Sequence, residues 1–306
     1  MNAAFILGFT ESFMEKTKII TVVGPTASGK SEYALSLAEK LGGEIISGDS
    51  MQIYRGMDIG TAKPTPYEMR GIRHHLIDIA DIEEPFSVSK FVILAEKAIE
   101  DVSSREKTPI IAGGTGLYID TLVSGISLSE TEEDEELREK LYKEASEHGA
   151  EALHEKLKAI DEKSAESIHP NNIKRVVRAL EIYYTTGMTK SELDEKSKRE
   201  SRYDAKTILL VPKERETLYN RIDARVDKMF ERGLEEEVKG LVDKGLRDCP
   251  TASQAIGYKE FYPYFDGVCG IGAVKEAIKL NTRHYAKRQL TWFLRRNYED
   301  VEIKEF

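Results

Sequence analysis

The stretch Gly-Pro-Thr-Ala-Ser-Gly-Lys-Ser at residues 24–31 decides the fold of this chain. It carries the complete pattern G-x-x-x-x-G-K-[ST], in which glycines let successive backbone N–H groups face one anion. The apolar run at residues 19–23 predicts a buried parallel strand, and the apolar spacing at residues 31–41 predicts a helix. In this context a glycine turn that only packs a strand against a helix is the weaker interpretation, and we predict a polyphosphate site.

The pattern assigns the whole stretch to phosphate binding: Gly24, Pro25, Thr26, Ala27, Ser28, Gly29, Lys30 and Ser31. The start of the following helix contributes partial positive charge to this site. Lys30 supplies a full point charge, and the Ser31 hydroxyl is placed to reach a Mg²⁺ ion bound to the phosphates.

Strand, loop and helix alternate from residue 18 to about residue 126. Further strands are predicted at 44–47, 75–79 and 108–112, and a helix through residues 91–99. This alternation predicts an α/β fold of the P-loop NTPase type, with a parallel sheet flanked by helices. Because ligands bind at the carboxyl ends of such strands, we expect the glycine loop, Asp49 and Thr115 to share one cleft.

The character of the chain changes at about residue 130, where a highly charged stretch without strand signals begins. Helices are predicted in it at 136–147, 150–160 and 172–186. The run 207–212 predicts a return to the sheet, and the rest is expected to be helical, at 215–232, 234–244 and 274–297. We therefore divide the chain into an N-terminal extension (1–17), an α/β core (18–129 and 200–306) and an all-helical insertion (130–199).

The chain has 306 residues, of which 40% are apolar, enough for a substantial core. No stretch reaches the ~20 apolar residues of a membrane span, and residues 1–9 lack the features of a signal peptide. Cys249 and Cys269 have no His or Cys at ligand spacing, which argues against zinc and favours a reducing compartment. We expect a cytoplasmic monomer without a membrane partner.

The net charge of −9 hides two basic clusters. One lies between Lys275 and Tyr298, where the only acid is Glu276 and the basic residues are Lys275, Lys279, Arg283, Lys287, Arg288, Arg295 and Arg296. The other, Lys174, Arg175 and Arg178, lies in the insertion. A segregated basic surface on an acidic protein is compatible with an RNA partner, although each cluster alone is also explained as a solvated helix face.

Residues 49–64, Asp-Ser-Met-Gln-Ile-Tyr-Arg-Gly-Met-Asp-Ile-Gly-Thr-Ala-Lys-Pro, resemble the signature of the tRNA dimethylallyltransferases, also called tRNA isopentenyltransferases. The glycine loop is similar to that of this family. Further motifs match the family in order, at 74–78, 113–118, 178–181, 254–260 and 285–292. The resemblance runs from about residue 18 to residue 298, and ordered motifs are far more specific than a glycine loop alone.

This resemblance implies transfer of a dimethylallyl group from dimethylallyl diphosphate to N6 of the adenosine at tRNA position 37, next to the anticodon. The glycine loop would hold the pyrophosphate leaving group, with Lys30 and a Mg²⁺ ion on Ser31 stabilising its growing charge. Asp49 matches the general base of the family, which assists a weakly nucleophilic aryl amine. Thr115 matches a family residue at the reacting centre or the leaving group, and capping of the following helix is its alternative role.

The resemblance also implies how the RNA is held. The base-contacting segment of the family corresponds to Asp49, Ser50, Met51 and Gln52, where the Gln52 amide offers adenine both a donor and an acceptor. The anticodon stem-loop would be gripped by the insertion through Lys174, Arg175, Val176, Val177 and Arg178, whose basic members would touch phosphates.

Two arginines, Arg221 and Arg225, are four residues apart and therefore lie on one helix face. Both are candidate clamps for the diphosphate, and we favour Arg221 because Arg225 can instead pair with Asp223 or Asp227. Lys63, Gln52 and Arg55 are weaker candidates for positioning substrate. His74 and His75 are adjacent in a predicted strand, so they point to opposite faces and are interpreted as structural.

Three other functions fit parts of the sequence. An adenylate isopentenyltransferase would perform the same chemistry on free AMP, ADP or ATP, but the charged helical insertion is surplus for so small an acceptor. A small-molecule kinase would use the glycine loop for ATP and Asp49 as a base toward a hydroxyl. A noncatalytic RNA-binding protein would leave the convergence of the loop, Asp49 and Thr115 without a reason. We rank tRNA prenylation first, the adenylate enzyme second and the kinase third.

Overall fold

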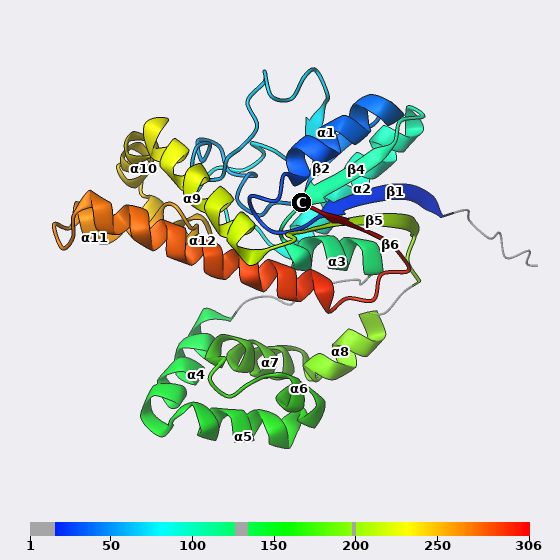
Figure 1. Cartoon of the computed structure of the whole chain (residues 1–306). Helices are drawn as coiled ribbons and strands as arrows, with labels where there is room; N and C mark the ends of the chain where they lie inside the picture. The colour runs from blue at the N-terminus through cyan, green and yellow to red at the C-terminus, as the bar shows by residue number, and fades with distance from the viewer. Residues whose placement is uncertain (1–15, 126–133, 198–199) are drawn as a thin grey trace, which may run out of the picture.

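The computed structural model describes residues 16–125, 134–197 and 200–306 (Figure 1). Its core is one parallel sheet made of β1 (Thr17–Val23), β2 (Glu44–Ser47), β3 (His74–His75), β4 (Pro109–Gly113), β5 (Tyr203–Val211) and β6 (Asp300–Glu305). The strand order is β3-β2-β4-β1-β5-β6, so β1 lies in the interior between β4 and β5. An interior parallel strand is covered on both faces, which accounts for the continuous apolar sequence of β1. The predicted α/β fold is confirmed.

Helices cover both faces of this sheet. The core helices are α1 (Lys30–Leu41), α2 (Val88–Ser104), α3 (Gly116–Ser124), α9 (Arg215–Glu231), α10 (Leu234–Val242), α11 (Tyr262–Phe265) and α12 (Ile271–Leu294), with short 3₁₀ turns at Leu246–Asp248, Ala252–Gln254 and Lys259–Phe261. Helix α1 packs Ala34, Leu35 and Ala38 against Val22, Ile45 and Ile110. Helices α2 and α3 pack into a separate and larger cluster, and Figure 1 shows α1 and α3 on opposite sides of the sheet.

The glycine loop joins β1 to α1 at the carboxyl end of the sheet. A Cβ atom at Gly24 would lie 2.8 Å from the carbonyl oxygen of Leu210 in β5, so only glycine lets the loop pass this close to the neighbouring strand. Gly29 has a φ of 87°, in the left-handed region that glycine tolerates. These two backbone demands explain the glycines that define the sequence pattern.

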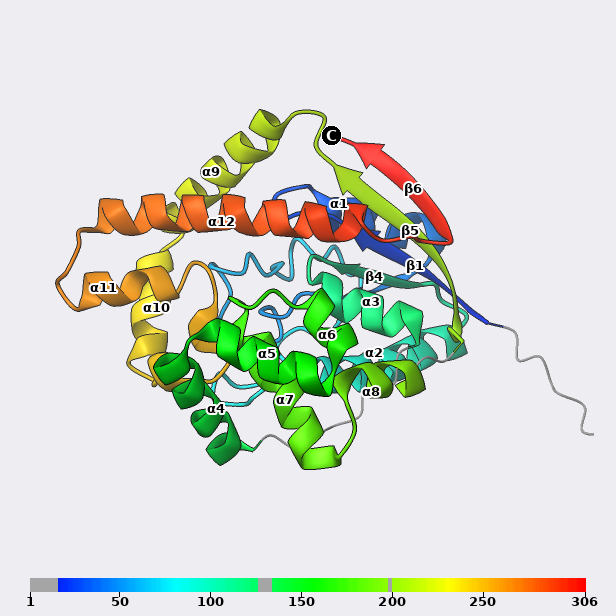
Figure 2. The ribbon, with the colours of Figure 1, turned by 90° about the horizontal axis from the view of Figure 1, so that it is seen from below.

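Helices α9 and α12 lie side by side and cover the end of the sheet where the loop is found (Figures 1 and 2). Ile222 of α9 and Ala286 of α12 are fully buried in one small apolar cluster, which also includes Ala27 of the glycine loop. Arg283 of α12 forms an ion pair with Asp223 of α9. Helix α12, near the end of the chain, is therefore packed against the glycine loop near its beginning.

The insertion is entirely helical where it is described. Figure 1 shows it below the core, and Figure 2, which is seen from below, shows it in front of the core. It consists of α4 (Glu135–His148), α5 (Ala150–Ile160), α6 (Glu162–Ser167), α7 (Ile173–Thr186) and α8 (Lys190–Ser197). Leu141, Leu157 and Leu180 belong to an apolar core of its own. The fully buried Glu181 is neutralised by Arg138 and Arg178, as a buried carboxylate requires. The predicted boundaries near residues 130 and 199 lie outside the described residues.

The structure differs from the sequence prediction at several elements. The rest of the chain after residue 215 is not wholly helical, because β6 pairs with β5 as the last strand of the sheet. The sequence of β6 alternates charged with apolar residues and is largely exposed, so it lacks the apolar run by which the other strands were predicted. The strand predicted at 75–79 is only β3, since Leu76 and Asp78 adopt left-handed φ values of 62° and 55°. Helices α6 and α8 were not predicted.

The predicted start of the core shifts slightly. Strand β1 begins at Thr17, one residue before the predicted start of the core at residue 18, and residues 1–15 lie outside the described part. Across residues 16–125, 134–197 and 200–306, no helix combines the length and apolar character needed to cross a membrane.

Candidate active site

A pocket of about 310 Å³ lies where the carboxyl ends of β1, β2 and β4 meet α9 and α12. The glycine loop contributes Thr26, Lys30 and Ser31 to its lining, and the segment after β2 contributes Asp49, Ser50, Met51 and Gln52. The prediction that loop and acid share one cleft is therefore confirmed for these residues. Its remaining walls come from parts of the chain that the sequence did not connect to the loop.

Lys30 lies at the floor of this pocket with its charge poorly compensated. Its Nζ donates to the carbonyl oxygen of Pro25 at 3.3 Å and has no salt-bridge partner among the described residues. Burial and the nearby Arg225 lower the pKa of Lys30 to about 8, while the Asp49 carboxylate opposes this effect. A lysine that is hard to keep charged becomes easier to charge when an anionic ligand arrives.

Arg225, and not Arg221, enters this pocket. Burial lowers the pKa of Arg225, and its guanidinium donates to the carbonyl oxygen of Thr61 at 3.3 Å. Arg221 is exposed and stacks its guanidinium 4.5 Å from the centre of the Phe306 ring. Our preference for Arg221 is thus corrected, because Asp223 pairs with Arg283 and Asp227 pairs with Lys275 and Lys279, leaving Arg225 to the pocket.

Asp49 follows the end of β2 and is held by the backbone. Its Oδ1 accepts hydrogen bonds from the N–H groups of Met51 at 2.9 Å and of Gln52 at 3.4 Å. The second carboxylate oxygen has no partner among the described residues. Tyr285 of α12 also lines the pocket, and burial together with the Asp49 charge raises its pKa to about 12. Asp49 therefore has a fixed orientation and one oxygen available for a ligand.

Thr115 occupies the N-cap position of α3, but its hydroxyl does not cap that helix. Its Oγ1 accepts a hydrogen bond from the N–H of Ser50 at 3.0 Å instead. Thr115 is not part of the pocket lining and lies behind Ser50. The capping alternative is therefore wrong, and the observed contact joins the turn after β4 to the turn after β2.

Gln52 has a side chain whose two ends are both engaged. Its Oε1 accepts from the Ser47 hydroxyl at 3.1 Å, and its Nε2 lies 3.4 Å from the carbonyl oxygens of Thr61 and Ala62. The amide is thus oriented by the protein in advance of any base. Lys63, by contrast, is buried between Asp58 and Asp78 and is a structural ion pair rather than a substrate contact.

Gln289 of α12 is a pocket residue that sequence reasoning missed. Its Oε1 accepts from the N–H of Thr26 in the glycine loop at 2.8 Å, and its Nε2 donates to the carbonyl oxygen of Gly114 at 2.9 Å. A Cβ atom at Gly114 would lie 2.2 Å from this nitrogen, so the glycine makes the contact possible. Residue 289 lies in the matching motif 285–292, which was the available signal.

An apolar wall completes the pocket and was also missed. It is formed by Ile222, Val226 and Met229 of α9, with Ile256 and Ile278 facing them. In the sequence, the spacing 222, 226, 229 is that of any helix packing on a core, so nothing in it pointed to a ligand. The site combines cations at one end with apolar surface at the other.

The glycine loop retains unused capacity to bind an anion and a metal. The Oγ of Ser28 is buried and has no hydrogen-bond partner among the described residues. Ser31 lines the same pocket as Asp49, which follows β2. An all-oxygen donor set suits Mg²⁺, so these residues fit the ion that the pattern predicts.

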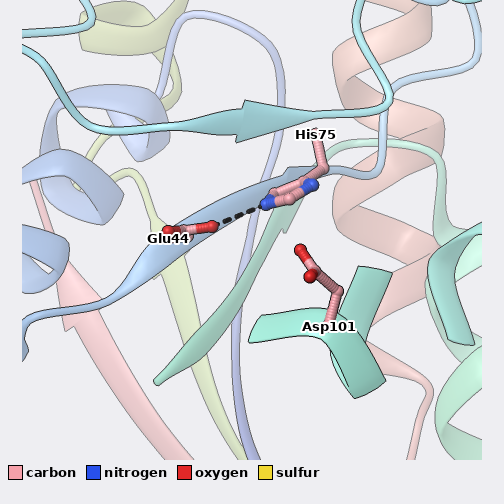
Figure 3. Close-up of side chains that lie close together, drawn as sticks. All are labelled: Glu44, His75 and Asp101. Atoms are coloured by element: carbon pink, nitrogen blue, oxygen red, sulfur yellow. Dashed lines mark hydrogen bonds and ion pairs between the residues drawn. The ribbon is translucent and has the colours of Figure 1, made fainter. Parts of the chain in front are cut away.

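A second group of metal-binding residue types lies at the opposite edge of the sheet (Figure 3). Ligand atoms of Glu44, His75 and Asp101 lie within 4.8 Å of one another. The Glu44 carboxylate already accepts from His75 at 2.8 Å and from Arg105 and Lys107 at 2.8 Å each. Arg105 and Lys107 already neutralise the Glu44 carboxylate, which disfavours a metal ion here and supports the interpretation of the histidine as structural.

The basic cluster of α12 divides into two halves. Lys275, Lys279, Arg283 and Arg296 are bound to acids of the protein. Lys287, Arg288 and Arg295 are exposed and have no ion-pair partner among the described residues. With His284, Thr291, Trp292 and Arg296 they line a groove of about 630 Å³ on α12. Arg288 also lines the pocket, so the groove and the pocket meet at this residue.

The predicted RNA-contacting segment of α7 is only partly on the surface. Lys174 and Arg175 are exposed and have no ion-pair partner in the described ranges. Val176 and Val177 are 0% and 1% exposed and pack in the insertion core, so predicting direct RNA contact for them was wrong. The guanidinium of Arg178 donates to the buried Glu181 at 2.6 Å, which gives it a structural role.

Comparison with known proteins connects this geometry to a family. The sequence model of the IPP transferase family matches residues 52–297. The tRNA dimethylallyltransferases of Geobacillus thermodenitrificans and Geobacillus kaustophilus are 55% and 53% identical to this chain, covering 93% and 90% of it and 89% and 87% of their own lengths.

Solved structures agree with the sequence matches. The tRNA isopentenylpyrophosphate transferase of Bacillus halodurans is 47% identical, with a TM-score of 0.70 over 95% of this chain and 90% of its own. A eukaryotic dimethylallyltransferase acting on tRNA is 32% identical, with a TM-score of 0.79 over 94% of this chain and 74% of its own. The chain belongs to the IPP transferase family, the family of the tRNA dimethylallyltransferases.

Proposed function

We propose that this protein transfers a dimethylallyl group from dimethylallyl diphosphate to N6 of the adenosine at tRNA position 37, releasing pyrophosphate. The observation that carries the proposal is the composition of one pocket. A glycine loop with Lys30, a half-buried Arg225, an apolar wall and the Asp49 carboxylate all face the same space. These are the groups that a prenyl diphosphate and an amine acceptor require.

The diphosphate belongs at the glycine loop. Backbone N–H groups, the start of α1 and Lys30 attract phosphate oxygens whatever group is esterified to them. Arg225 adds a planar donor pair from the facing helix. Charge that grows on departing pyrophosphate would be stabilised by groups already in place.

The dimethylallyl chain belongs against the apolar wall. Ile222, Val226 and Met229 exclude water from the reacting carbon, and burying its five carbons is favourable because each buried CH₂ contributes about 0.8 kcal/mol. Exclusion of water also protects an allylic carbon from hydrolysis. The same wall distinguishes this site from a nucleotide triphosphate site, which needs polar contacts to a ribose.

Asp49 is the group placed to assist the amine. In the transfer the N6–C1 bond forms, the C1–O bond to pyrophosphate breaks, and the N6 proton becomes acidic as nitrogen gains positive charge. The free oxygen of Asp49 can accept that proton, while the amides of Met51 and Gln52 hold the carboxylate in place. Gln52 would present its oriented amide to the adenine edge.

Mg²⁺ is the cofactor we propose, held by the Ser31 hydroxyl together with diphosphate oxygens. When bound it supplies positive charge to the leaving group. Lys30 and Arg225 supply the remainder, and their spacing is set by the loop and by α9.

The α12 groove is the proposed route of the RNA. Its exposed Lys287, Arg288 and Arg295 favour a polyanion, and Trp292 offers a face on which an unstacked base can rest. Because Arg288 lines both the groove and the pocket, a base extruded from a loop bound there reaches Asp49 by a short path. Lys174 and Arg175 of the insertion would contact the stem.

We further propose that one chain acts alone, in the cytoplasm where tRNA is modified. In support of this, the glycine loop, Asp49 and the apolar wall of one chain together form a pocket with all the groups that the reaction requires. An adenylate acceptor is the second candidate, and the basic groove beside the pocket disfavours it because a mononucleotide has no use for it. ATP-dependent phosphoryl transfer is disfavoured by the apolar wall.

The test is transfer of radiolabel from dimethylallyl diphosphate, with Mg²⁺, in parallel to unmodified tRNA and to AMP. Label in tRNA, mapped to the adenosine beside the anticodon, supports the proposal. Label in AMP alone preserves the pocket assignments and replaces the acceptor. Label in neither, with ATP hydrolysis, returns the loop to the kinase interpretation.

A further inference from the structure

Glu237 does not line the pocket, but its carboxylate binds a loop that does. It lies on α10 and accepts four hydrogen bonds. Three come from consecutive backbone N–H groups, those of Asp58 at 3.1 Å, Ile59 at 2.7 Å and Gly60 at 3.1 Å. Three successive amides converging on one carboxylate form an anion-binding nest that the protein fills with its own side chain.

The fourth bond comes from Tyr258, whose hydroxyl donates to Glu237 at 2.7 Å. Tyr258 is 0% exposed, and its ring passes so close to Gly60 that a Cβ atom there would lie 2.4 Å away. The loop at residues 58–62 is thus pinned on one side by a buried ring and by a carboxylate. A hydrogen bond between the Thr61 hydroxyl and the carbonyl oxygen of Met57, at 2.6 Å, closes the loop on itself.

The other side of this loop faces the pocket. Gly60, Thr61 and Ala62 belong to its lining. The carbonyl oxygen of Thr61 accepts from Arg225 at 3.3 Å and from Gln52 at 3.4 Å, and Ala62 accepts from Gln52 as well. The amides that Glu237 holds and the carbonyls that orient Arg225 and Gln52 therefore belong to one short segment.

We infer that Glu237 is a positioning residue for the transfer, acting through the 58–62 loop on Arg225 and Gln52. Without its carboxylate, three neighbouring N–H groups lose their acceptor and the loop has no charged anchor to α10. The carbonyl oxygens of Thr61 and Ala62, which orient the Arg225 guanidinium and the Gln52 amide, then lose their fixed position. This inference rests on the proposed function, because it assigns a role within the same reaction.

The sequence provides a matched control in the run Glu235, Glu236 and Glu237. Glu236 precedes Glu237 on the same helix, is exposed, and has no hydrogen bond or ion pair among the described residues. Replacing either residue by glutamine removes one negative charge from α10 with the same change of size. Only at Glu237 does the change also replace, by an NH₂ group, one of the two oxygens that accept from backbone amides.

The experiment compares Glu237→Gln, Glu237→Asp and Glu236→Gln with the wild type in dimethylallyl transfer to tRNA. We expect Glu237→Gln to raise the KM for dimethylallyl diphosphate about tenfold and to lower kcat about tenfold, because the carbonyl oxygens that orient Arg225 and Gln52 are no longer held in place. Glu236→Gln should match the wild type in both constants. Glu237→Asp keeps the charge that the fold uses but shortens the reach, and should give intermediate values.

The KM separates positioning from folding. Partial loss of folded protein lowers kcat in proportion and leaves KM unchanged, so a lower kcat with a wild-type KM would overturn the inference. Wild-type constants in Glu237→Gln or in Glu237→Asp would overturn it as well. If the wild type itself transfers no label to tRNA, the proposed function fails, and the role of Glu237 in that transfer falls with it.

Discussion

The two ends of strand β2 treat charge in opposite ways. Glu44 opens the strand at the amino edge of the sheet, and its carboxylate is surrounded by His75, Arg105 and Lys107 (Figure 3). Asp49 follows the strand at the carboxyl edge, where its only hydrogen bonds from the described residues come from backbone N–H groups. There Lys30 and Arg225 face it across a pocket without forming a salt bridge among the described residues.

The pKa values reflect this difference. Hydrogen bonds from Arg105 hold the pKa of Glu44 far below its usual range, so every charge at that edge is stabilised by another. At the carboxyl edge, burial instead lowers the pKa of both Lys30 and Arg225, so their charged forms are disfavoured in the free protein. Compensated charges support the fold, whereas charges left uncompensated beside each other indicate where an anionic ligand belongs.

Replacement of the Asp49 carboxylate should have the largest effect. Asp49→Asn keeps an oxygen for the N–H of Met51, so the turn should persist, but it removes the proton acceptor. We expect single-turnover transfer to fall about 10²- to 10⁴-fold with tRNA affinity unchanged. An unchanged single-turnover rate would remove Asp49 as the base. It would also weaken the conclusion that the carboxyl edge of the sheet is the functional one.

Replacement of the pocket arginine comes next. Arg225→Lys loses the planar donor pair and should raise the KM for dimethylallyl diphosphate about 10- to 100-fold. Arg221→Lys is the matched control on the same helix, because Arg221 stacks on Phe306 outside the pocket. Equal effects of the two substitutions on KM would contradict the assignment of Arg225 as the diphosphate clamp, and Arg221 would again be a candidate for that role.

The compensated edge should respond in stability instead of activity. Glu44→Gln removes the anion that Arg105 and Lys107 share, and we expect the free energy of unfolding to fall by about 2 kcal/mol. Because folding lowers the pKa of Glu44, its contribution is complete at neutral pH and is lost as the pH falls below 4.5.

Denaturant unfolding at pH 7 and at pH 3 measures this contribution. The free energies of unfolding of the wild type and Glu44→Gln should differ more at pH 7 than at pH 3. The KM values of the variant should be unchanged. A variant of wild-type stability but reduced turnover would mean that the two edges of the sheet are not separated in function.

The insertion offers a smaller effect. The double substitution Lys174→Ala with Arg175→Ala should weaken tRNA binding about tenfold and reduce the slope of log affinity against log salt by about 1 to 2. Arg178 is a poor choice for this test because it stabilises the buried Glu181. Fluorescence binding at several salt concentrations decides the matter, and an unchanged slope would exclude these two residues as the RNA grip.

The smallest predicted effect is the pH dependence of Lys30. With a pKa of about 8, Lys30 is mostly charged at pH 7 and loses charge as the pH rises. Between pH 7 and 8.5 we expect kcat/KM for dimethylallyl diphosphate to fall about fourfold. Because the pKa is lowered on folding, the same group makes the free energy of unfolding rise with pH between about 8 and 10.5.

Lys30→Arg is the control for this profile. Arginine keeps its charge over the whole range, so the fall in kcat/KM above pH 8 should disappear even if the absolute activity is lower. A fall of the same size in this variant would assign the titration to another group.

Local chemistry explains what could be predicted. The glycine loop, β1 and α1 are contiguous, and their signals of apolar run, glycine spacing and helical stripe depend on near neighbours in the chain. The placement of Asp49 followed from the general rule for carboxyl ends of parallel strands, and the structure confirms it in the same pocket as the loop.

Residues that face inward from a helix were harder to assign. Arg221 and Arg225 share a helix face to within one turn, and only the packing of α9 on α12, with Asp223 and Asp227 bound by cations of α12, decides which arginine enters the pocket. Val176 and Val177 were predicted to contact RNA together with their basic neighbours, although they are buried in the apolar core of the insertion. Strand β6 depends on an edge of β5 that no local signal describes.

The sequence by itself determined the glycine loop, the α/β core and the family, because these depend on short contiguous patterns. Only the tertiary structure decided that Gln289 bridges Thr26 and Gly114, that Ile222 and Met229 form an apolar wall, and that Glu237 anchors the loop beside Arg225. Such contacts join residues far apart in the chain. Their existence depends on how whole helices pack, and packing is a property of the completed fold.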